Sequence, residues 1–327
     1  MISRRDFTLS LGCATLASPL MQARAQAAYP NKPVKIVIPW PVGGAVDNHS
    51  RALSVDLQKK WNQTVIIEAR PGGNGIIGAE YSARSAPDGY TIYNGNDSSI
   101  CMLPFLYKTL SYDPIKDFEP VVCMMAGVST ALVAASLPIK SFKELIDYAK
   151  ANPGKINYGS FGIGSKTHVD TEALSLLTGI KMTHIPYKGI ADVNAAMAAG
   201  ELHFALGIAS AVMPNIQKGL IRPIFVAGEQ RTPVLPDVPT IKEAGGPDFV
   251  SRSWFGLFFP AKTPAAIVDK VANDVAEISE SAAFKERYVL GFGLDPLVLK
   301  PAAFRELIQK DTAFYRDALA KLNLKLE

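Results

Sequence analysis

The sequence has few of the residues on which most catalytic and metal-binding motifs depend. It holds three cysteines and four histidines among 327 residues, with no zinc-ligand spacing and no CxxC, HExxH or GxSxG motif. A metalloenzyme, a serine hydrolase or a redox-active cysteine pair therefore has no support. We expect no catalytic residue, no metal and no cofactor.

The sequence also lacks a large excess of positive or negative charge, and it lacks long apolar runs. The chain has 34 basic and 30 acidic residues, and its first 27 residues hold three of the basic and one of the acidic ones, which leaves 31 against 29. Such a balance gives no reason to expect nucleic acid as a partner. No run of about 18 apolar residues predicts a membrane-spanning helix.

The first 27 residues have the organisation of a signal peptide. A basic start at Arg4-Arg5 precedes a moderately apolar stretch from Leu9 to Leu20, and small residues follow. The SRRDF segment at residues 3–7 resembles a bacterial twin-arginine signal. We therefore expect a soluble mature protein that begins near Ala28 and is exported to the periplasm. There Cys101 and Cys123 could form a disulfide, although two separate buried thiols fit equally well.

Alternating strand and helix patterns predict an α/β fold. The β-rich run Val34–Pro39 is followed by a glycine-rich turn and a helical pattern at Asp47–Lys60, and similar units begin at Thr64–Glu68 and Tyr90–Tyr93. This alternation indicates a mainly parallel sheet covered on both faces.

The same pattern restarts in the middle of the chain and predicts a second lobe. Ser141 is expected to cap a helix, and further strands are expected at 128–135, 156–159, 182–185, 204–207 and 223–227. Residues 254–259 have the pattern of an apolar strand. The chain after residue 259 has the pattern of two amphipathic helices, which we expect to pack back on the first lobe. We expect lobe 1 to comprise residues 28–128 and 252–327, and lobe 2 to comprise residues 129–251.

Two glycine-rich segments are candidate ligand loops. The PWPVGGAVD segment at residues 39–47 lies between a strand and a helix, where free N–H groups and the helix terminus attract anions. An ordinary glycine turn with Asp47 as helix cap also fits. The other segment, with Gly73, Gly75 and Gly78, matches the G-x-G-x-x-G pattern of dinucleotide-binding folds. It allows an alternative function as an exported Rossmann-type oxidoreductase.

Seven segments resemble successive signatures of the Bug (TctC-like) family, the receptors of tripartite tricarboxylate transporters. In chain order they are YPNKPVKIVIPWPVGGAVD, VIIEARPGGNGIIGAE, APDGYTI, LYKTLSYDPIKDFEPV, HIPYKG, LPDVPTIKEAG and WFGLFFPAKTP. The resemblance implies a type II periplasmic-binding-protein fold with two lobes, a central ligand cleft and a small carboxylate ligand. It also implies that the PGGNG loop serves without a nucleotide.

The candidate ligand-binding residues lie in loops that match this family, except Gly207 and Arg252, which lie where this sequence departs from it. In lobe 1 they are Val42, Gly43, Gly44, Asp47, Ser98 and Ser99. In lobe 2 and at its junction with lobe 1 they are Gly164, Ser165, Thr167, His168, Tyr187, Lys188, Gly207 and Arg252.

Backbone amides of the Gly43-Gly44 loop and of the Gly164-Ser165 loop are expected to be free for a carboxylate, with the Ser165 and Thr167 hydroxyls adding donors. His168 also fits a buried structural histidine. Arg252 is either a clamp for a second carboxylate or a solvent-facing side chain. No acid follows Gly207, which suits a ligand without an ammonium group.

These observations predict a monomeric, non-enzymatic solute-binding protein. It would capture a small organic carboxylate, which could be a dicarboxylate or an aromatic acid. It would deliver this ligand to the membrane components of a tripartite tricarboxylate-type transporter. Two hinge strands near residues 126–130 and 251–255 would absorb the closing movement.

Overall fold

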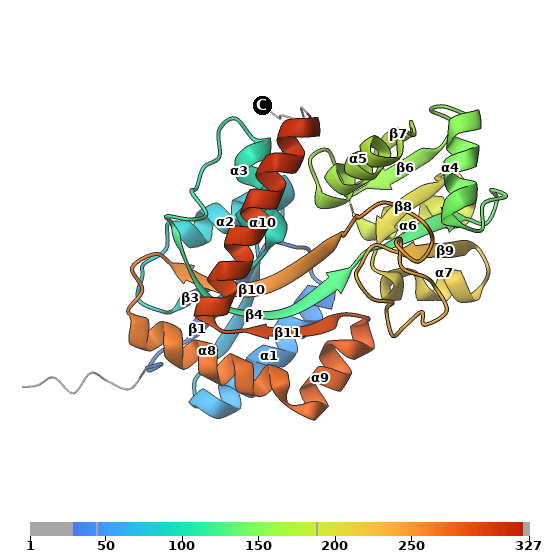
Figure 1. The fold of residues 1–327 in the computed structure, drawn as a ribbon. Helices are drawn as coiled ribbons and strands as arrows, with labels where there is room; N and C mark the ends of the chain where they lie inside the picture. The colour runs from blue at the N-terminus through green and yellow to red at the C-terminus, as the bar shows by residue number, and fades with distance from the viewer. Residues whose placement is uncertain (1–28, 44, 188, 323–327) are drawn as a thin grey trace, which may run out of the picture.

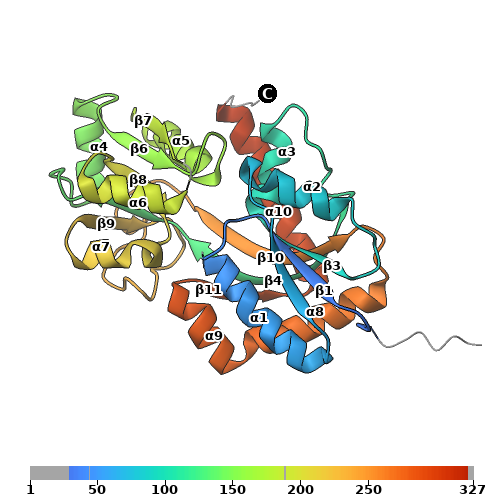
Figure 2. The same ribbon diagram turned by 180° about the vertical axis from the view of Figure 1, so that it is seen from behind.

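The structure is a computed structural model that describes residues 29–43, 45–187 and 189–322. Within these ranges the chain forms two β-sheets, one of six strands and one of five, and each sheet belongs to a separate lobe (Figure 1). Helices cover both faces of each sheet (Figures 1 and 2). The predicted α/β class with two lobes is confirmed, whereas the signal-peptide prediction lies outside the described residues.

The six-stranded sheet has the order β11-β4-β10-β3-β1-β2. Strands β1, β2 and β3 are parallel, and β10 pairs antiparallel with both β3 and β4. The bounds are β1 Val34–Ile38, β2 Val65–Ala69, β3 Thr91–Asn96, β4 Phe118–Val128, β10 Arg252–Pro260 and β11 Asp295–Leu299. The sheet is therefore mixed rather than mainly parallel.

The five-stranded sheet has the order β7-β6-β8-β5-β9. Strand β6 is parallel to β7 and β8, whereas β5 is antiparallel to β8 and β9. The bounds are β5 Thr130–Ala134, β6 Asn157–Ser160, β7 Thr183–Pro186, β8 Phe204–Gly207 and β9 Ile221–Val226. Both sheets thus combine a parallel βαβ portion with antiparallel strands next to the connection between the lobes.

Ten α-helices and four short helical turns are described. In lobe 1 they are α1 Ala45–Trp61, η1 Gly73–Gly75, α2 Ile76–Ala83, η2 Ser98–Met102, α3 Leu103–Leu106, α8 Ala265–Glu280, α9 Ala282–Tyr288, η4 Leu290–Phe292 and α10 Pro301–Leu322. In lobe 2 they are α4 Phe142–Ala151, α5 Lys166–Thr178, α6 Ile190–Ala199, η3 Ala209–Val212 and α7 Met213–Gln217. No described helix is both long enough and apolar enough to cross a membrane.

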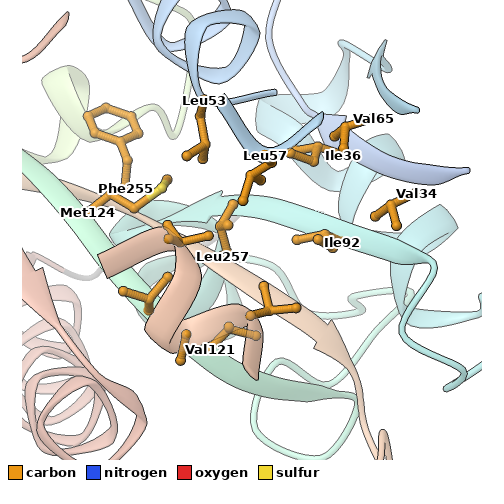
Figure 3. Close-up of a cluster of buried hydrophobic side chains, with 14 of the residues drawn as sticks. Val34, Ile36, Leu53, Leu57, Val65, Ile92, Val121, Met124, Phe255 and Leu257 are labelled. Atoms are coloured by element: carbon orange, nitrogen blue, oxygen red, sulfur yellow. The ribbon is translucent and has the colours of Figure 1, made fainter. Parts of the chain in front are cut away.

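Local sequence explains how these helices begin and which face they bury. Ser141 caps α4 as predicted, because its Oγ accepts a hydrogen bond from the Glu144 backbone N–H at 3.2 Å. In lobe 1, Leu53 and Leu57 lie one turn apart on α1 and pack onto a sheet face that includes Leu257 (Figure 3). Burying each such leucine contributes roughly 1.5–3 kcal/mol to stability.

The hinge between the lobes consists of extended backbone that is hydrogen-bonded to itself. Ser129 separates β4 from β5, and its N–H donates to the Ser251 carbonyl at 2.9 Å. The Ser251 N–H donates to the Ala227 carbonyl at 2.8 Å, and the Ala227 N–H donates to the Ser129 carbonyl at 2.7 Å. The chain therefore passes between the lobes through paired strands rather than through loose linkers.

The fold corrects one sequence expectation, adds a strand that was not predicted and decides one open alternative. The last segment forms α8, α9, β11 and α10, not two helices only, because the short run after Leu294 adds an edge strand to β4. Strand β4 was not predicted, since Pro120, two methionines and a glycine weaken its strand pattern. Cys101 and Cys123 are two free, buried thiols and not a disulfide.

Candidate functional site

Strand order places a topological switch point at the carboxyl ends of β1 and β3 in lobe 1. The chain runs from β1 outward to β2 and then returns past β1 to β3, so the strand order reverses between β1 and β3. Ligands of open α/β sheets bind at such topological switch points, outside the carboxyl ends of the strands. The loops at this point are residues 39–43 and residues 97–99. They hold the predicted Val42, Gly43, Ser98 and Ser99, and the predicted Asp47 lies in the first turn of α1.

Lobe 2 repeats this arrangement with β6 and β8. The chain runs from β6 outward to β7 and then returns past β6 to β8. The switch-point loops are residues 161–165 and residues 208–209, next to the predicted Ser165 and Gly207. Helices α1 and α6 both begin on the side of their lobe that faces the other lobe (Figure 2). The two switch points therefore share the region between the lobes.

The lobe 1 glycine loop is held by its own helix. Gly43 has a left-handed φ of 90°, and a Cβ there would meet nothing within 4 Å, so the loop borders open space. The Gly43 N–H was expected to be free, but it donates to Asp47 Oδ2 at 2.8 Å. The buried Asp47 also accepts from the Arg51 guanidinium at 3.0 Å. Asp47 therefore fixes the loop, whereas Val42 stands 66% exposed beside it.

The second lobe 1 loop offers one unused hydroxyl. Ser99 is engaged with the strand end, since its N–H donates to Asn96 Oδ1 at 3.0 Å and its Oγ donates to the Asn96 carbonyl at 3.0 Å. Ser98 lies beside it in η2, is 6% exposed, and has no hydrogen-bond partner for its Oγ among the described residues. Ser98 is thus the better ligand donor of the two predicted serines.

The N–H groups of the lobe 2 loop likewise donate to nearby side chains. Ser165 caps α5 by accepting from the His168 N–H at 3.4 Å. The Gly164 N–H donates to His168 Nδ1 at 3.0 Å, and the Phe161 N–H donates to Thr167 Oγ1 at 3.3 Å. The expectation of a free Gly164 amide is therefore wrong. The Ser165 hydroxyl accepts from the His168 N–H and lies 3.3 Å from Thr167 Oγ1, where either hydroxyl can be the donor.

His168 has a structural environment that also orders the loop. Its ring stacks on His184 with centroids 4.0 Å apart, and Tyr158 stacks on His184 at 5.0 Å. Burial lowers the pKa of His168, and burial together with His168 lowers the pKa of His184 to about 4. Both rings are therefore neutral near pH 7, and His184 Nε2 lies 2.6 Å from Ser160 Oγ. His168 holds the loop without supplying positive charge.

The other predicted residues lie at the ends of strands β7, β8 and β10. Tyr187 follows β7, and its N–H donates to the Ser160 carbonyl at 3.0 Å. Gly207 ends β8 and is buried. Arg252 begins β10 at the hinge, where its guanidinium lies 3.8 Å from the Glu229 carboxylate and its side chain is 36% exposed. The predicted residues Gly44 and Lys188 lie outside the described residues.

One element of the site was missed in the sequence. Helix α6 starts at Ile190 after Gly189, and no side chain caps it. The first N–H groups of an uncapped helix lack helical partners and favour an anion. A Cβ on Gly189 would meet nothing within 4 Å, so this terminus also borders open space. The sequence signal was present, since a glycine directly precedes an apolar helical pattern.

The G-x-G-x-x-G segment has a packing role. It follows β2, an edge strand that is not at the switch point. A Cβ on Gly78 would lie 3.1 Å from Pro39 Cβ and 3.1 Å from the Arg70 carbonyl oxygen, so a side chain there would require these neighbours to shift. Asn74 has a left-handed φ and donates from Nδ2 to the Ile163 carbonyl of lobe 2 at 3.1 Å. The segment therefore joins the lobes, as a structural contact.

Comparison with known proteins agrees with this architecture. A family model described as tripartite tricarboxylate transporter family receptor matches residues 50–324. The UPF0065 protein in the gbd 5' region of Cupriavidus necator is 32% identical over 329 residues, which is 99% of this chain and 99% of that protein.

Two solved structures share the fold over their whole length. R. palustris Rpa4515 with adipate has a TM-score of 0.84 and 31% identity, covering 91% of this chain and 99% of that chain. MatC from Rhodopseudomonas palustris with bound malate has a TM-score of 0.79 and 27% identity, covering 89% of this chain and 100% of that chain. The resemblance to Bug (TctC-like) receptors is thereby confirmed, and the oxidoreductase alternative is wrong. This chain belongs to the tripartite tricarboxylate transporter receptor (TctC) family and is a substrate-binding receptor, not an enzyme.

Proposed function

We propose that this receptor captures a small organic carboxylate between its lobes in the periplasm and delivers it to the membrane components of a tripartite tricarboxylate transporter. Residues 28–128 with 252–327 would form one lobe and residues 129–251 the other. Export would follow the twin-arginine signal within residues 1–27, and the protein would act as a monomer. The adipate and malate held by two similar structures support a carboxylate ligand.

The observation that carries this proposal is the pair of switch points between the lobes. Lobe 1 offers the Ser98 hydroxyl and the open side of the Gly43 loop. Lobe 2 offers the Ser165 hydroxyl and the uncapped start of α6 at Gly189. Hydroxyl and backbone N–H groups form charge-assisted hydrogen bonds with a carboxylate. A ligand that contacts both lobes favours the closed form, because its affinity for that form is higher.

Arg252 decides between ligand classes within this proposal. Its weak contact with Glu229 leaves a guanidinium that can pair bidentately with a second carboxylate. In that role it would favour dicarboxylates over monocarboxylates. Tyr187, which follows β7 next to the lobe 2 loop, would border the body of the ligand.

A thermal-shift screen tests the proposal. The mature protein is melted with mono-, di- and tricarboxylates, aliphatic and aromatic, and in parallel with nicotinamide cofactors. A bound acid at 100 times its Kd adds about 2.7 kcal/mol to the free energy of unfolding and raises the Tm by roughly 5 °C. Stabilisation by cofactors and not by acids, or recovery of a chemically changed acid, would contradict the proposal.

A further inference from the structure

A buried lysine joins the two lobes next to the proposed carboxylate site. Lys166 is the first residue of α5 and follows Ser165, but its side chain reaches lobe 1. Its Nζ lies 2.5 Å from Tyr315 Oη on α10 and 3.4 Å from Asp97 Oδ2 at the end of β3. Only 11% of the Lys166 side chain and none of the Asp97 side chain is exposed. This is a charged contact across the boundary between the lobes.

Each charge also has a partner within its own lobe. In lobe 2, Lys166 Nζ lies 2.9 Å from Asp170 Oδ2, one turn further along α5. In lobe 1, the Tyr315 hydroxyl donates to Asp97 Oδ2 at 2.8 Å. Separation of the lobes would break the contacts of Lys166 with Asp97 and Tyr315 and leave the other two intact. Each half of the network would therefore keep one of its contacts if the lobes moved apart.

The joined arrangement depends on the lysine charge. Burial acts to lower the pKa of Lys166, but Asp170 and Asp97 outweigh it and raise the pKa above its ordinary value. Burial raises the pKa of Asp97, and Lys166 opposes this effect. Asp97 Oδ1 is buried without a hydrogen-bond partner among the described residues. A buried carboxylate is costly unless a cation lies beside it, so removal of the cation disfavours the joined lobes.

We propose that Lys166 is a positioning residue for ligand capture, whose ion pair with Asp97 forms when the lobes close and breaks when they open. The pair brings the Ser165 loop against lobe 1 without touching the ligand. It raises the apparent affinity, because a larger closed population binds ligand more tightly overall. This inference rests on the proposed function, since it assumes a ligand between the lobes.

Calorimetry with the tightest-binding acid of the screen measures the effect. Lys166→Met leaves Asp97 and Asp170 without their cation in the closed form, and we expect the Kd to rise about 10- to 100-fold. Asp97→Asn removes the buried charge together with its attraction, so the Kd should change less than about 5-fold. The double variant should bind more tightly than Lys166→Met, because Asp97 is no longer an unpaired buried charge, and more weakly than wild type, because the ion pair is absent. Lys143→Met, which removes an exposed lysine paired with Asp147 in the same lobe, is the matched control and should bind normally.

Distances between the lobes test the ion pair without any ligand. Spin labels are placed on cysteines at the exposed positions Lys59 of lobe 1 and Lys155 of lobe 2, since the native cysteines are buried. In ligand-free protein, Lys166→Met should shift the population to a different interlobe distance, and the added Asp97→Asn should reverse the shift. If no acid binds the wild type, the proposed function fails, while these distances still decide whether the ion pair controls closure.

Tyr315→Phe keeps both charges and removes only the hydroxyl between them. We expect it to fold and to weaken binding about 3- to 10-fold. The proposal is overturned if Lys166→Met folds, binds like wild type and leaves the distances unchanged. It is also overturned if the double variant binds no better than Lys166→Met, because Lys166 would then act on the ligand directly or support the fold alone. Wild-type binding by Tyr315→Phe would count against it as well.

Discussion

Replacement of Ser165 by alanine tests the lobe 2 half of the proposed site. The buried hydroxyl caps α5 by accepting from the His168 N–H and lies 3.3 Å from Thr167 Oγ1. Loss of the cap costs about 1 kcal/mol of the free energy of unfolding. A hydroxyl that also donates to a bound carboxylate contributes about 1.5–3 kcal/mol to binding. We therefore expect calorimetry to give a Kd about 10- to 100-fold higher, with a Tm lower by roughly 2–4 °C.

Ser141→Ala is the matched control for this change. Ser141 caps α4 through the same type of hydrogen bond, and α4 lies on the outer side of lobe 2, away from lobe 1 (Figure 1). Its loss should lower the Tm by a similar amount and leave the Kd unchanged. If Ser165→Ala lowers the Tm in the same way but binds with wild-type affinity, Ser165 is a cap only, and the reasoning that places a carboxylate at this loop is refuted.

Three further predictions concern export, pH and ligand class. Replacement of both Arg4 and Arg5 by lysine should trap unprocessed precursor in the cytosol, which fractionation and immunoblotting would show. Unchanged processing would argue against the twin-arginine signal. Burial lowers the pKa of the fully buried His49 to about 4, so the unfolded chain binds more protons and stability falls as the pH drops from about 6.5 towards 4. His49→Leu should therefore raise the Tm more at pH 5 than at pH 8, and an equal change at both would contradict this cause. Arg252→Gln should weaken a dicarboxylate about 10-fold more than the matching monocarboxylate. Arg231→Gln, which removes an arginine of lobe 2 that is also paired with a carboxylate, should not.

Much of the fold could be predicted because its βα units carry strong local signals. The run at Val34–Ile38 lies between prolines and is followed by glycines and a helical pattern, and Ser141 marks the start of α4. Strand β4 and strand β11 were not predicted, since Pro120 and Pro296 interrupt them and their pairing comes from distant strands. Tertiary contacts rather than local preference determine such strands.

The loops at the two switch points were predictable from the sequence, but their hydrogen bonding was not. Family-like loops identified both switch points, because strand ends and glycine turns are visible in sequence. The sequence could not show that Asp47 and His168 already accept the Gly43 and Gly164 N–H groups, since those bonds depend on side-chain conformation. It also could not show that Lys166 crosses between the lobes, because its partners lie 69 and 149 residues away along the chain.

A crystal structure of the mature protein with its tightest-binding acid tests the central claim most directly. The account predicts closed lobes and a carboxylate within hydrogen-bond distance of Ser165 Oγ or the α6 amides in lobe 2, and of Ser98 Oγ or the Gly43 loop in lobe 1. An acid bound to one lobe alone, or at a place away from these loops, would contradict the account.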